Sequence, residues 1–496
     1  MKLSNILNSL GLILVAFGTI MLSPIIVALI EQEYSSIPPF IIAATISVAL
    51  GLSFRKYGGF SRNFDDLKRN EGILIVVLTW IVTAAMGAIP YLFYGLSPVD
   101  AYFESVSGIT TTGATILSDF SIYPKDFFFW RSLTQWLGGM GIIVLFVAIL
   151  PQFAIAGRQM FFAEAPGPTE EKVTPRIAHT AKALWLVYIG LTLMEIALLI
   201  WAGMPVFDAI CNSLTTMAAG GFSPHPLSIM GYENSAVTWI VTCFMFLAGS
   251  NFALQYRVIA KRKPMALLQN EEFRFYGIII LATSICLCLI LLGGNAYHVN
   301  DAIRDSLFQI ISLITTAGFS SADFALWSVA AQTILFTVML VGGCAGSAGG
   351  GVKVIRVLFG FKYLKREITQ IIHPQAILPV KIDKKSVPDE IQRQILGFFL
   401  FYFTLMSCSA LIVTAIEGDA AVGLVGTAAT IGNIGPGFGE IGPMGSFGGL
   451  TIITKVIFIL NMVVGRLELI PFLAMLHPDF WNFKRGNIFQ RRRQNS

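Results

Sequence analysis

The stretch DAYFESVSGITTTGAT, from Asp100 to Thr115, decides the fold because it is too polar to cross a membrane yet lies between two long hydrophobic segments. It begins with an aspartate, continues for about three helical turns and ends in threonines followed by Gly113. The same plan recurs three times, as Asp208 with AAGGFS at 218–223, Asp301 with TTAGFS at 315–320, and Asp419 with NIGPGF at 433–438. The aspartate-to-glycine distances are 13, 13, 17 and 16 residues, which indicates an internal repeat.

Each repeat predicts a short helix that starts at its aspartate, as the N-cap residue, and enters the membrane from one side. The partial negative charge of the helix C-terminus would then point toward a cation. The glycine lets the backbone turn, so that carbonyl oxygens line a narrow path and replace the water shell of an ion. Irregular backbone at that depth requires surrounding protein or a watery cavity, so four such loops around one axis would form a filter. Four unrelated loops outside the membrane are the alternative, and the shared aspartate–alanine start counts against it.

The composition is that of an integral membrane protein rather than a soluble domain. Hydrophobic residues make up 55% of the 496 residues and charged residues only 13%, about half the charged share of typical soluble domains. The six cysteines show no paired metal-type spacing and are interpreted as small core residues. The net charge of +5 requires no nucleic-acid partner.

Ten hydrophobic runs are long enough to cross a membrane. They lie at about 7–30, 38–54, 72–94, 128–152, 181–203, 236–258, 274–293, 328–358, 393–416 and 448–475. The first run is too long for the core of a signal peptide and is expected to stay as a span. We therefore predict an all-α integral membrane protein with ten transmembrane helices, arranged as an N-terminal hairpin plus four fused helix–pore loop–helix units around a pseudo-fourfold pore. The expected boundaries are 1–68 for the hairpin and 69–158, 159–263, 264–375 and 376–496 for units 1 to 4.

Basic residues gather in the segments on one side of these spans, at 55–69, 158–182, 257–263, 362–393 and 484–493. The positive-inside rule makes that side cytoplasmic, with both termini inside and the four polar loops facing outward. The outer segments carry acids at Glu31, Glu33, Asp100, Glu104, Asp119, Asp126, Asp208, Glu233, Asp301, Asp305, Asp323, Glu417, Asp419 and Glu440. This excess would concentrate cations at an outer mouth and repel anions, although ordinary solvated acids left there by topology are the alternative.

The segment FWRSLTQWLGGMGII, residues 129–143, resembles a signature of the Trk/Ktr/HKT superfamily of potassium transporters, in particular its bacterial Trk-type membrane subunits. The loop endings TTTGAT, AAGGFS, TTAGFS and NIGPGF resemble the four filters of that family, and the resemblance covers nearly the whole chain. It implies a channel-like fold of four fused pore units, with one glycine per unit in a K⁺ filter. K⁺ would be the transported ion, and no bound organic cofactor is expected.

The resemblance places the filter at Thr111, Thr112, Gly113, Gly220, Gly221, Phe222, Ala317, Gly318, Phe319, Asn433, Ile434 and Gly435. The K⁺ ligands would be the backbone carbonyls of Thr111, Thr112, Ala219, Gly220, Thr316, Ala317, Asn433 and Ile434. Relatives with serine at the first filter glycine tend toward Na⁺, so Gly113 favours K⁺. The fourth loop departs most from the pattern, and it offers both Gly435 and Gly437 as the glycine that faces the ion.

The predicted span at 328–358 is interrupted by the sequence GGCAGSAGGG at 342–351. Its glycines are Gly342, Gly343, Gly346, Gly349, Gly350 and Gly351. Each glycine destabilises a helix by up to about 1 kcal/mol relative to alanine, so the helix should break inside the membrane. The resemblance implies that this loop is a gate below the filter, whereas a helix-packing face of small residues is the alternative.

Two enzymatic interpretations of the same segment fail. It lacks the lysine–serine ending of a phosphate-binding loop. Ser347 has no base available, because all five histidines fall outside the spans or at their ends. We therefore predict that the protein is not an enzyme.

Arg466 lies within the last predicted span, where a charge is unfavourable by about 2.5 to 3.5 kcal/mol and should face protein or water. The resemblance implies an arginine beneath the filter that stands close to the gate loop as a cationic barrier. The alternatives are an arginine that reaches the cytoplasmic headgroups or pairs with Glu468. Lys455, higher in the same span, is a candidate partner for an acid of the pore loops.

The sequence as a whole predicts a subunit for K⁺ uptake across the bacterial inner membrane. The resemblance implies a homodimer in membrane lipid that pairs with a cytoplasmic nucleotide-binding regulatory subunit of the RCK type. The basic segments 156–180 and 360–392 are candidate docking surfaces for that subunit, although topology alone also explains their charge. A secondary transporter that couples K⁺ to H⁺ or Na⁺ is the alternative function.

Overall fold

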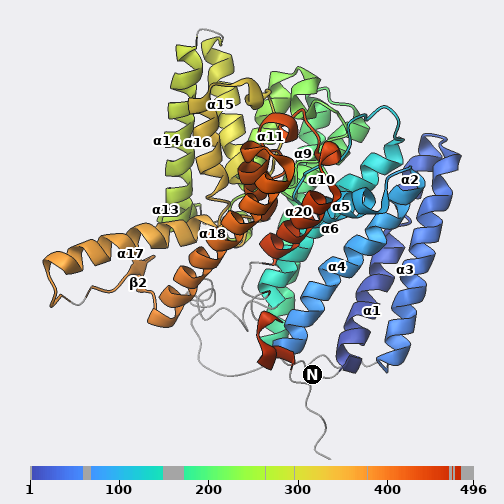
Figure 1. The fold of residues 1–496 in the computed structure, drawn as a ribbon, viewed down its shortest axis with the longest axis horizontal. Helices are drawn as coiled ribbons and strands as arrows, with labels where there is room; N and C mark the ends of the chain where they lie inside the picture. Colours follow the sequence, from blue (N-terminus) through green and yellow to red (C-terminus); the bar gives the residue numbers. More distant parts are fainter. Residues whose placement is uncertain are drawn as a thin grey trace, which may run out of the picture.

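The structure is a computed structural model that describes residues 3–59, 69–148, 173–262, 264–294, 297–376, 378–467, 472 and 475–481. Its regular secondary structure in these residues is helical, apart from two short strands. The chain begins with the helices α1 (Leu3–Ile20), α2 (Pro24–Ile30) and α3 (Ile37–Tyr57), and α1, α3 and α4 lie side by side at one end of the molecule (Figure 1).

Glycines let α1 and α3 pack closely. A Cβ atom on Gly11 would lie 2.5 Å from the carbonyl oxygen of Gly51, and one on Gly51 would lie 2.8 Å from that of Gly11. Small residues at such a crossing bring two backbones together, which is a common basis for helix association in membranes.

Four groups of elements follow, and each begins with a long helix, continues with the helix that precedes one of the four loops, called a short helix below, and ends with one or two further helices. The first three groups contain α4 (Arg69–Phe93), α5 (Pro98–Ile109) and α6 (Lys125–Ala148); α9 (Val173–Trp201), α10 (Val206–Met217), α11 (Ser235–Ala248) and α12 (Phe252–Lys261); α14 (Glu271–Gly293), α15 (Val299–Ile314), α16 (Val329–Met339) and α17 (Val354–Ile372). The fourth contains α18 (Asp389–Glu417), the π-helical turn η4 (Val422–Gly426), α19 (Thr427–Ile431) and α20 (Ile452–Arg466). Shorter elements are α13 (Met265–Gln269) and the one-turn helices η1 (Tyr34–Ser36), η2 (Ser228–Tyr232), η3 (Phe324–Leu326), η5 (Gly439–Ile441), η6 (Phe447–Gly449) and η7 (Pro478–Trp481).

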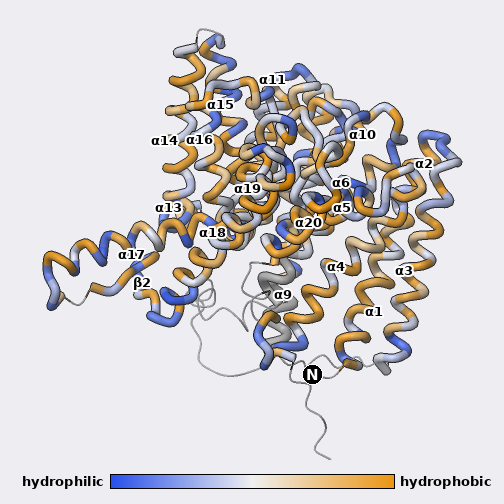
Figure 2. The backbone as a smooth tube through the Cα atoms, in the orientation of Figure 1, coloured by the Kyte–Doolittle hydropathy of each residue, from blue (hydrophilic) through white to orange (hydrophobic). Residues whose placement is uncertain are grey.

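Six helices of the described residues are long and apolar enough to cross a membrane, or seven if α11 and α12 count as one span. Figure 2 shows hydrophobic residues along α1, α3 and α4, with hydrophilic residues gathered at helix ends. The protein is therefore a multi-pass membrane protein, while the count of ten spans stays a prediction. The predicted spans 128–152 and 448–475 each run partly outside the described residues.

The prediction of one continuous span at 236–258 is wrong, because α11 and α12 meet at an angle of 103°. The side chain of Asn251 accepts hydrogen bonds from the backbone N–H groups of Ala253 (2.8 Å) and Leu254 (3.3 Å), which starts α12 as a new helix. Gly249 ends α11 where a Cβ atom would lie 2.4 Å from the side chain of Thr315, which follows the last residue of α15. An N-cap and a tight contact thus break a run whose composition is apolar throughout.

The predicted break in the eighth run is confirmed, since α16 ends at Met339 and α17 begins at Val354. Helix α17 projects sideways from the helical body, as Figure 1 shows. Two short antiparallel strands, β1 (Lys381–Ile382) and β2 (Lys385–Ser386), follow it, with Lys381 opposite Ser386. The sequence did not predict this hairpin, which packs Ile382 against buried Phe359 of α17 and Ile391 of α18.

The short helices begin before their aspartates, so the predicted N-cap role is wrong for three of the four. The N-cap residues are Ser97, Pro205 and His298, and each aspartate is the third helical residue. In the first repeat, Ser97 Oγ accepts from the Asp100 N–H at 3.2 Å and donates to Asp100 Oδ2 at 2.8 Å, a reciprocal cap. Only Asp419 caps directly, by accepting from the N–H of Ala421 at 2.7 Å. All four acids still lie near a helix N-terminus, where negative charge is favourable.

Candidate ion filter and gate

All four loops follow the same backbone path. In each, two residues with positive φ stand two positions apart, and the second is the glycine of the repeat. The pairs are Thr111 (53°) and Gly113 (83°), Ala219 (54°) and Gly221 (76°), Thr316 (60°) and Gly318 (75°), and Asn433 (54°) and Gly435 (102°). Positive φ is unfavourable for a β-branched residue such as threonine, so its recurrence marks a path that the surrounding structure imposes. The first residue of each pair was expected only as a carbonyl ligand, and its positive φ was not predicted from the sequence.

The four loops touch one another in a closed ring. A Cβ atom on Gly113 would lie 2.1 Å from the carbonyl oxygen of Gly220, one on Gly221 2.1 Å from that of Ala317, one on Gly318 2.0 Å from that of Ile434, and one on Gly435 2.7 Å from that of Thr112. Each loop thus abuts the next, and the fourth returns to the first. No side chain fits at these glycines, because the atom that it would meet is backbone.

The same contacts decide between the two glycines of the fourth loop. Gly435 has positive φ and touches Thr112 and Gly113 of the first loop. Gly437 instead turns toward its own segment, where its N–H donates to the carbonyl of Ile441 at 2.7 Å. Gly435 is therefore the member of the ring.

Side chains of the ring residues pack into the protein. Those fully buried are Thr111, Thr112, Ala219, Thr316, Ala317, Asn433, Ile434 and Phe319, with Phe222 nearly so. Asn433 links three segments, since its Nδ2 donates to Thr112 Oγ1 at 3.0 Å and to the Met462 carbonyl at 2.9 Å. Within the described part of the chain, no group of three or more His, Cys, Asp or Glu residues could hold a metal ion.

The first long inner helix, α6, braces the first two loops. Arg131 Nε donates to Glu104 Oε1 at 2.7 Å, and both residues are buried. The guanidinium also donates to Thr115 Oγ1 at 3.1 Å and lies 3.9 Å from the ring centroid of Phe222. One turn later, Gln135 Nε2 donates to the Gly220 carbonyl at 2.7 Å. Neither role was predicted from the sequence, although the four-residue spacing within the family signature places the two side chains on one helix face.

The predicted acidic mouth is partly wrong. Glu104, Asp126 and Asp305 are buried and bonded within the protein, so they are not solvated acids that attract ions. Asp119 is exposed, and hydrogen bonds from the Ser121 side chain and N–H lower the pKa of its carboxyl. It therefore stays charged in mildly acidic solution.

The glycine pair in the signature segment allows α6 to approach the ends of two short helices. A Cβ atom on Gly138 would lie 1.9 Å from the carbonyl oxygen of Ile109, the last residue of α5. One on Gly139 would lie 2.8 Å from the Cα atom of Ala218, just after α10. Any larger residue would push α6 away from the ring.

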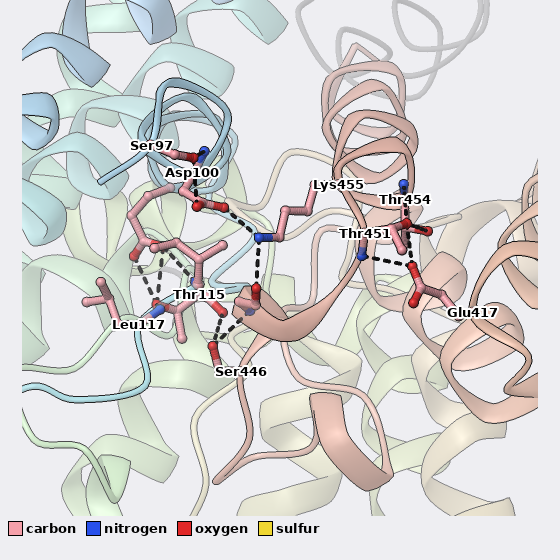
Figure 3. A network of polar contacts seen from close by, with 12 residues as sticks. Ser97, Asp100, Thr115, Leu117, Glu417, Ser446, Thr451, Thr454 and Lys455 are labelled. Carbon is pink, nitrogen blue, oxygen red and sulfur yellow. Dashed lines mark hydrogen bonds and ion pairs between the residues drawn. The ribbon is translucent and has the colours of Figure 1, made fainter. Parts of the chain in front are cut away.

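An ion pair lies beside the contact between the fourth and first loops. Lys455 Nζ lies 2.7 Å from Asp100 Oδ1 and donates to the Gly448 carbonyl at 2.8 Å (Figure 3). The Phe447 N–H donates to the Thr115 carbonyl at 2.9 Å. The hypothesis that Lys455 pairs with a pore-loop acid is confirmed.

The glycine-rich segment 340–353 lies against the ends of the third and fourth short helices. A Cβ atom on Gly349 would lie 2.5 Å from the Thr315 carbonyl, and one on Gly350 2.5 Å from the Gly432 carbonyl. The Gly350 N–H donates to Thr316 Oγ1 at 2.7 Å. Gly342, Gly346 and Gly351 have positive φ and the segment is not helical, so the alternative of a helix-packing face is wrong. Gly343, the remaining glycine of the segment, packs against Ser347 and Gly249.

The bend between α11 and α12 holds this segment. The N–H of Cys344 donates to the Gly249 carbonyl at 2.9 Å, and the N–H of Phe252 donates to the Gly346 carbonyl at 3.1 Å. Buried Glu272 of α14 accepts from the Ala345 N–H at 2.7 Å. These contacts could not be predicted from the sequence, because each joins groups that are far apart in the chain.

Arg466 points toward the same segment. It is 2% exposed, and its Nη1 donates to the Ala348 carbonyl at 2.9 Å. Its Nη2 donates to the Gly138 carbonyl of α6 at 3.3 Å. The alternative of an arginine that reaches the headgroups is therefore wrong, and Glu468 lies outside the described residues.

Apolar helices, a ring of four backbone turns and a broken span define a multi-pass membrane protein of the cation-transport class. A family model for TrkH, described as a cation transport protein, matches residues 41–481. The chain is 38% identical over 488 residues to the Trk system potassium uptake protein TrkH of Salmonella typhimurium, covering 97% of this chain and 100% of that protein. It is 34% identical over 475 residues to TrkG of Escherichia coli K12, covering 95% and 97%.

The crystal structure of the potassium transporter TrkH from Vibrio parahaemolyticus superimposes with a TM-score of 0.90 at 36% identity, covering 97% of this chain and all of that one. This chain belongs to the TrkH family of cation transport proteins, and its relatives are transporters rather than enzymes.

Proposed function

We propose that the protein takes up K⁺ across the bacterial inner membrane through a filter of four loops. The relatives with full-length similarity are named potassium uptake proteins. The observation that carries the proposal is the closed ring, in which each filter glycine abuts a carbonyl of the next loop. A ring of this kind brings main-chain oxygens from four directions around one path.

In this proposal the carbonyl oxygens replace the water shell of K⁺. The ligands are the carbonyls of Thr111, Thr112, Ala219, Gly220, Thr316, Ala317, Asn433 and Ile434. The short helices α5, α10, α15 and α19 end at these loops, so the partial negative charges of their C-termini favour a cation there. The chain then divides into the N-terminal hairpin and four pore units around a pseudo-fourfold axis.

Below the filter, the segment Gly342 to Gly351 and Arg466 form the gate. The proposal is supported by the contact of Gly349 and Gly350 with the ends of two short helices, and by the hydrogen bond from Arg466 to Ala348. A buried guanidinium beside the path repels a dehydrated cation, because Coulomb repulsion is strong where water is excluded. Conduction then requires that the loop and the arginine move apart from the path.

Regulation and assembly are part of the same proposal. The protein works as a homodimer, with both termini in the cytoplasm, and a nucleotide-binding regulatory subunit docks on its inner face. Of the two basic segments named for docking, 360–392 contains the projecting end of α17 and the β-hairpin, whereas 156–180 lies largely outside the described residues.

Rb⁺ flux into proteoliposomes under an applied voltage tests the filter. We expect Gly113→Ser to lower the preference for K⁺ over Na⁺, because the added atoms force the Gly220 carbonyl out of the ring. Gly95→Ser is the matched control: its φ is +85°, but a Cβ atom there meets nothing within 4 Å. Equal selectivity in the two variants would remove the filter assignment. Flux that requires an H⁺ or Na⁺ gradient would instead favour a coupled symporter.

A further inference from the structure

We propose that Gln135, a residue outside the four loops, sets the ion preference of the filter by weakening one carbonyl ligand. This inference rests on the proposed function, since it concerns how strongly the ring carbonyls bind K⁺ relative to Na⁺. Gln135 is a positioning residue in this account, because it acts through the backbone of the second loop.

The side chain of Gln135 forms two hydrogen bonds with the backbone of the second loop. Its Nε2 donates to the Gly220 carbonyl at 2.7 Å, and its Oε1 accepts from the Phe222 N–H at 3.1 Å. The two bonds span Gly221, the ring glycine of the loop. The side chain is fully buried, so water does not compete for either bond.

The Gly220 carbonyl is the oxygen that Gly113 of the first loop abuts. The equivalent oxygens in the other loops belong to Thr112, Ala317 and Ile434. Among the described residues, no side chain donates a hydrogen bond to any of these three carbonyls. The ring therefore holds three carbonyls that keep both lone pairs for an ion and one that shares a lone pair with an amide.

Arg131 keeps this arrangement rigid. It lies one helical turn before Gln135, and its guanidinium stacks on Phe222 while it pairs with Glu104 of the first pore helix. The face of α6 that carries these two side chains thus fixes the second loop against the first. A bound Na⁺ would need the ring to contract. Arg131 and Gln135 together oppose movement of the Gly220 oxygen.

The chemical consequence concerns the strength of the ligand. A carbonyl that already accepts an amide hydrogen bond offers less negative charge to an ion. A ring of stronger oxygens favours the smaller ion, because Na⁺ gains more from close contact than K⁺ does. Loss of the amide donor strengthens and frees the Gly220 oxygen, and both changes favour Na⁺.

The test measures the ratio of K⁺ to Na⁺ flux for the full-length protein in proteoliposomes. We expect Gln135→Met to lower the ratio about threefold or more, since one hydrogen bond has a net free energy equivalent to a factor of about 2 to 10. Gln135→Leu, made in parallel, also lacks the amide donor and should shift the ratio in the same direction. Gln309→Met is the matched control. Its fully buried amide on α15 donates to Ala322, outside the ring, at 3.4 Å.

Gly113→Ser distinguishes a failure of the Gln135 inference from a failure of the proposed filter. If Gly113→Ser lowers the ratio while both Gln135 variants match the wild type, this inference is overturned and the filter stands. If Gly113→Ser leaves the ratio unchanged, the proposed function fails first. For a Gln135 variant that conducts too little to measure, the melting temperature in K⁺ and in Na⁺ decides, because a bound ion stabilises the folded state. A difference between the two ions equal to that of the wild type would overturn the inference.

Discussion

Removal of Arg131 should destabilise the protein more than removal of any exposed basic residue, because it leaves Glu104 as an uncompensated buried charge. The two side chains are 2% and 0% exposed and lie 2.7 Å apart. Breaking a buried pair at one partner typically lowers the free energy of unfolding by about 3 to 5 kcal/mol. Arg131→Met keeps much of the side-chain volume, so we expect a loss within that range.

Lys125 provides the matched control. It pairs with Glu31 at 2.9 Å, but the two side chains are 48% and 31% exposed. Pairs of this kind contribute up to about 1 kcal/mol, so Lys125→Met should lie within that limit. The double variant Arg131→Met with Glu104→Gln removes the orphaned charge while its amide oxygen can still accept from the Ile116 N–H, which now bonds to Glu104 Oε2 at 3.0 Å. We expect it to recover at least half of the loss.

The assay is a denaturant titration of the purified protein in detergent, followed by the loss of helical signal, for the wild type and all three variants. The reasoning is wrong if Arg131→Met loses no more stability than Lys125→Met. It is also wrong if the double variant is as unstable as the single one, since the loss would then come from packing against Phe222 rather than from the orphaned carboxylate.

Three further predictions concern the proposed gate and the contact between the fourth and first loops. Arg466→Ala should raise basal Rb⁺ flux in the absence of any regulatory partner, because the cation beside the path is lost; flux at the wild-type level would contradict the barrier role. Gly350→Ala should also raise basal flux, since the methyl group would lie 2.5 Å from the Gly432 carbonyl and displace the loop, whereas Gly397→Ala, with no atom within 4 Å, should leave flux unchanged. Lys455→Met should lower the free energy of unfolding by about 1 to 3 kcal/mol through loss of a charged hydrogen bond, and a denaturant titration that shows no change would argue against the pair with Asp100.

Repetition in the sequence was sufficient to predict the four loops and their glycines, because a backbone turn with positive φ favours glycine. The glycine cluster at 342–351 predicted the broken span for the same reason. The bend at 249–251 could not be predicted from hydropathy. Hydropathy measures composition, and a short capped break inside an apolar run does not change the composition. Asn251 was the one local signal, as a capping residue within a predicted span.

The supporting residues were harder to predict, because their roles depend on contacts between distant parts of the chain. Gln135 lies 85 residues from Gly220, and nothing in its local sequence indicates that partner. The choice between Gly435 and Gly437 likewise needed the φ angles and the contact with Thr112. Burial of Glu104 escaped notice because a charge count treats every acid in an outer segment as solvated.

The joint between the first and last loops has a consequence for biosynthesis. Three joints of the ring connect loops that follow one another along the chain, but the fourth connects Asn433 with Thr112, 321 residues earlier. At a bacterial ribosome that interval takes roughly 15 to 60 s. The first three loops are therefore synthesised well before the fourth, and a product truncated before Asn433 cannot close the ring.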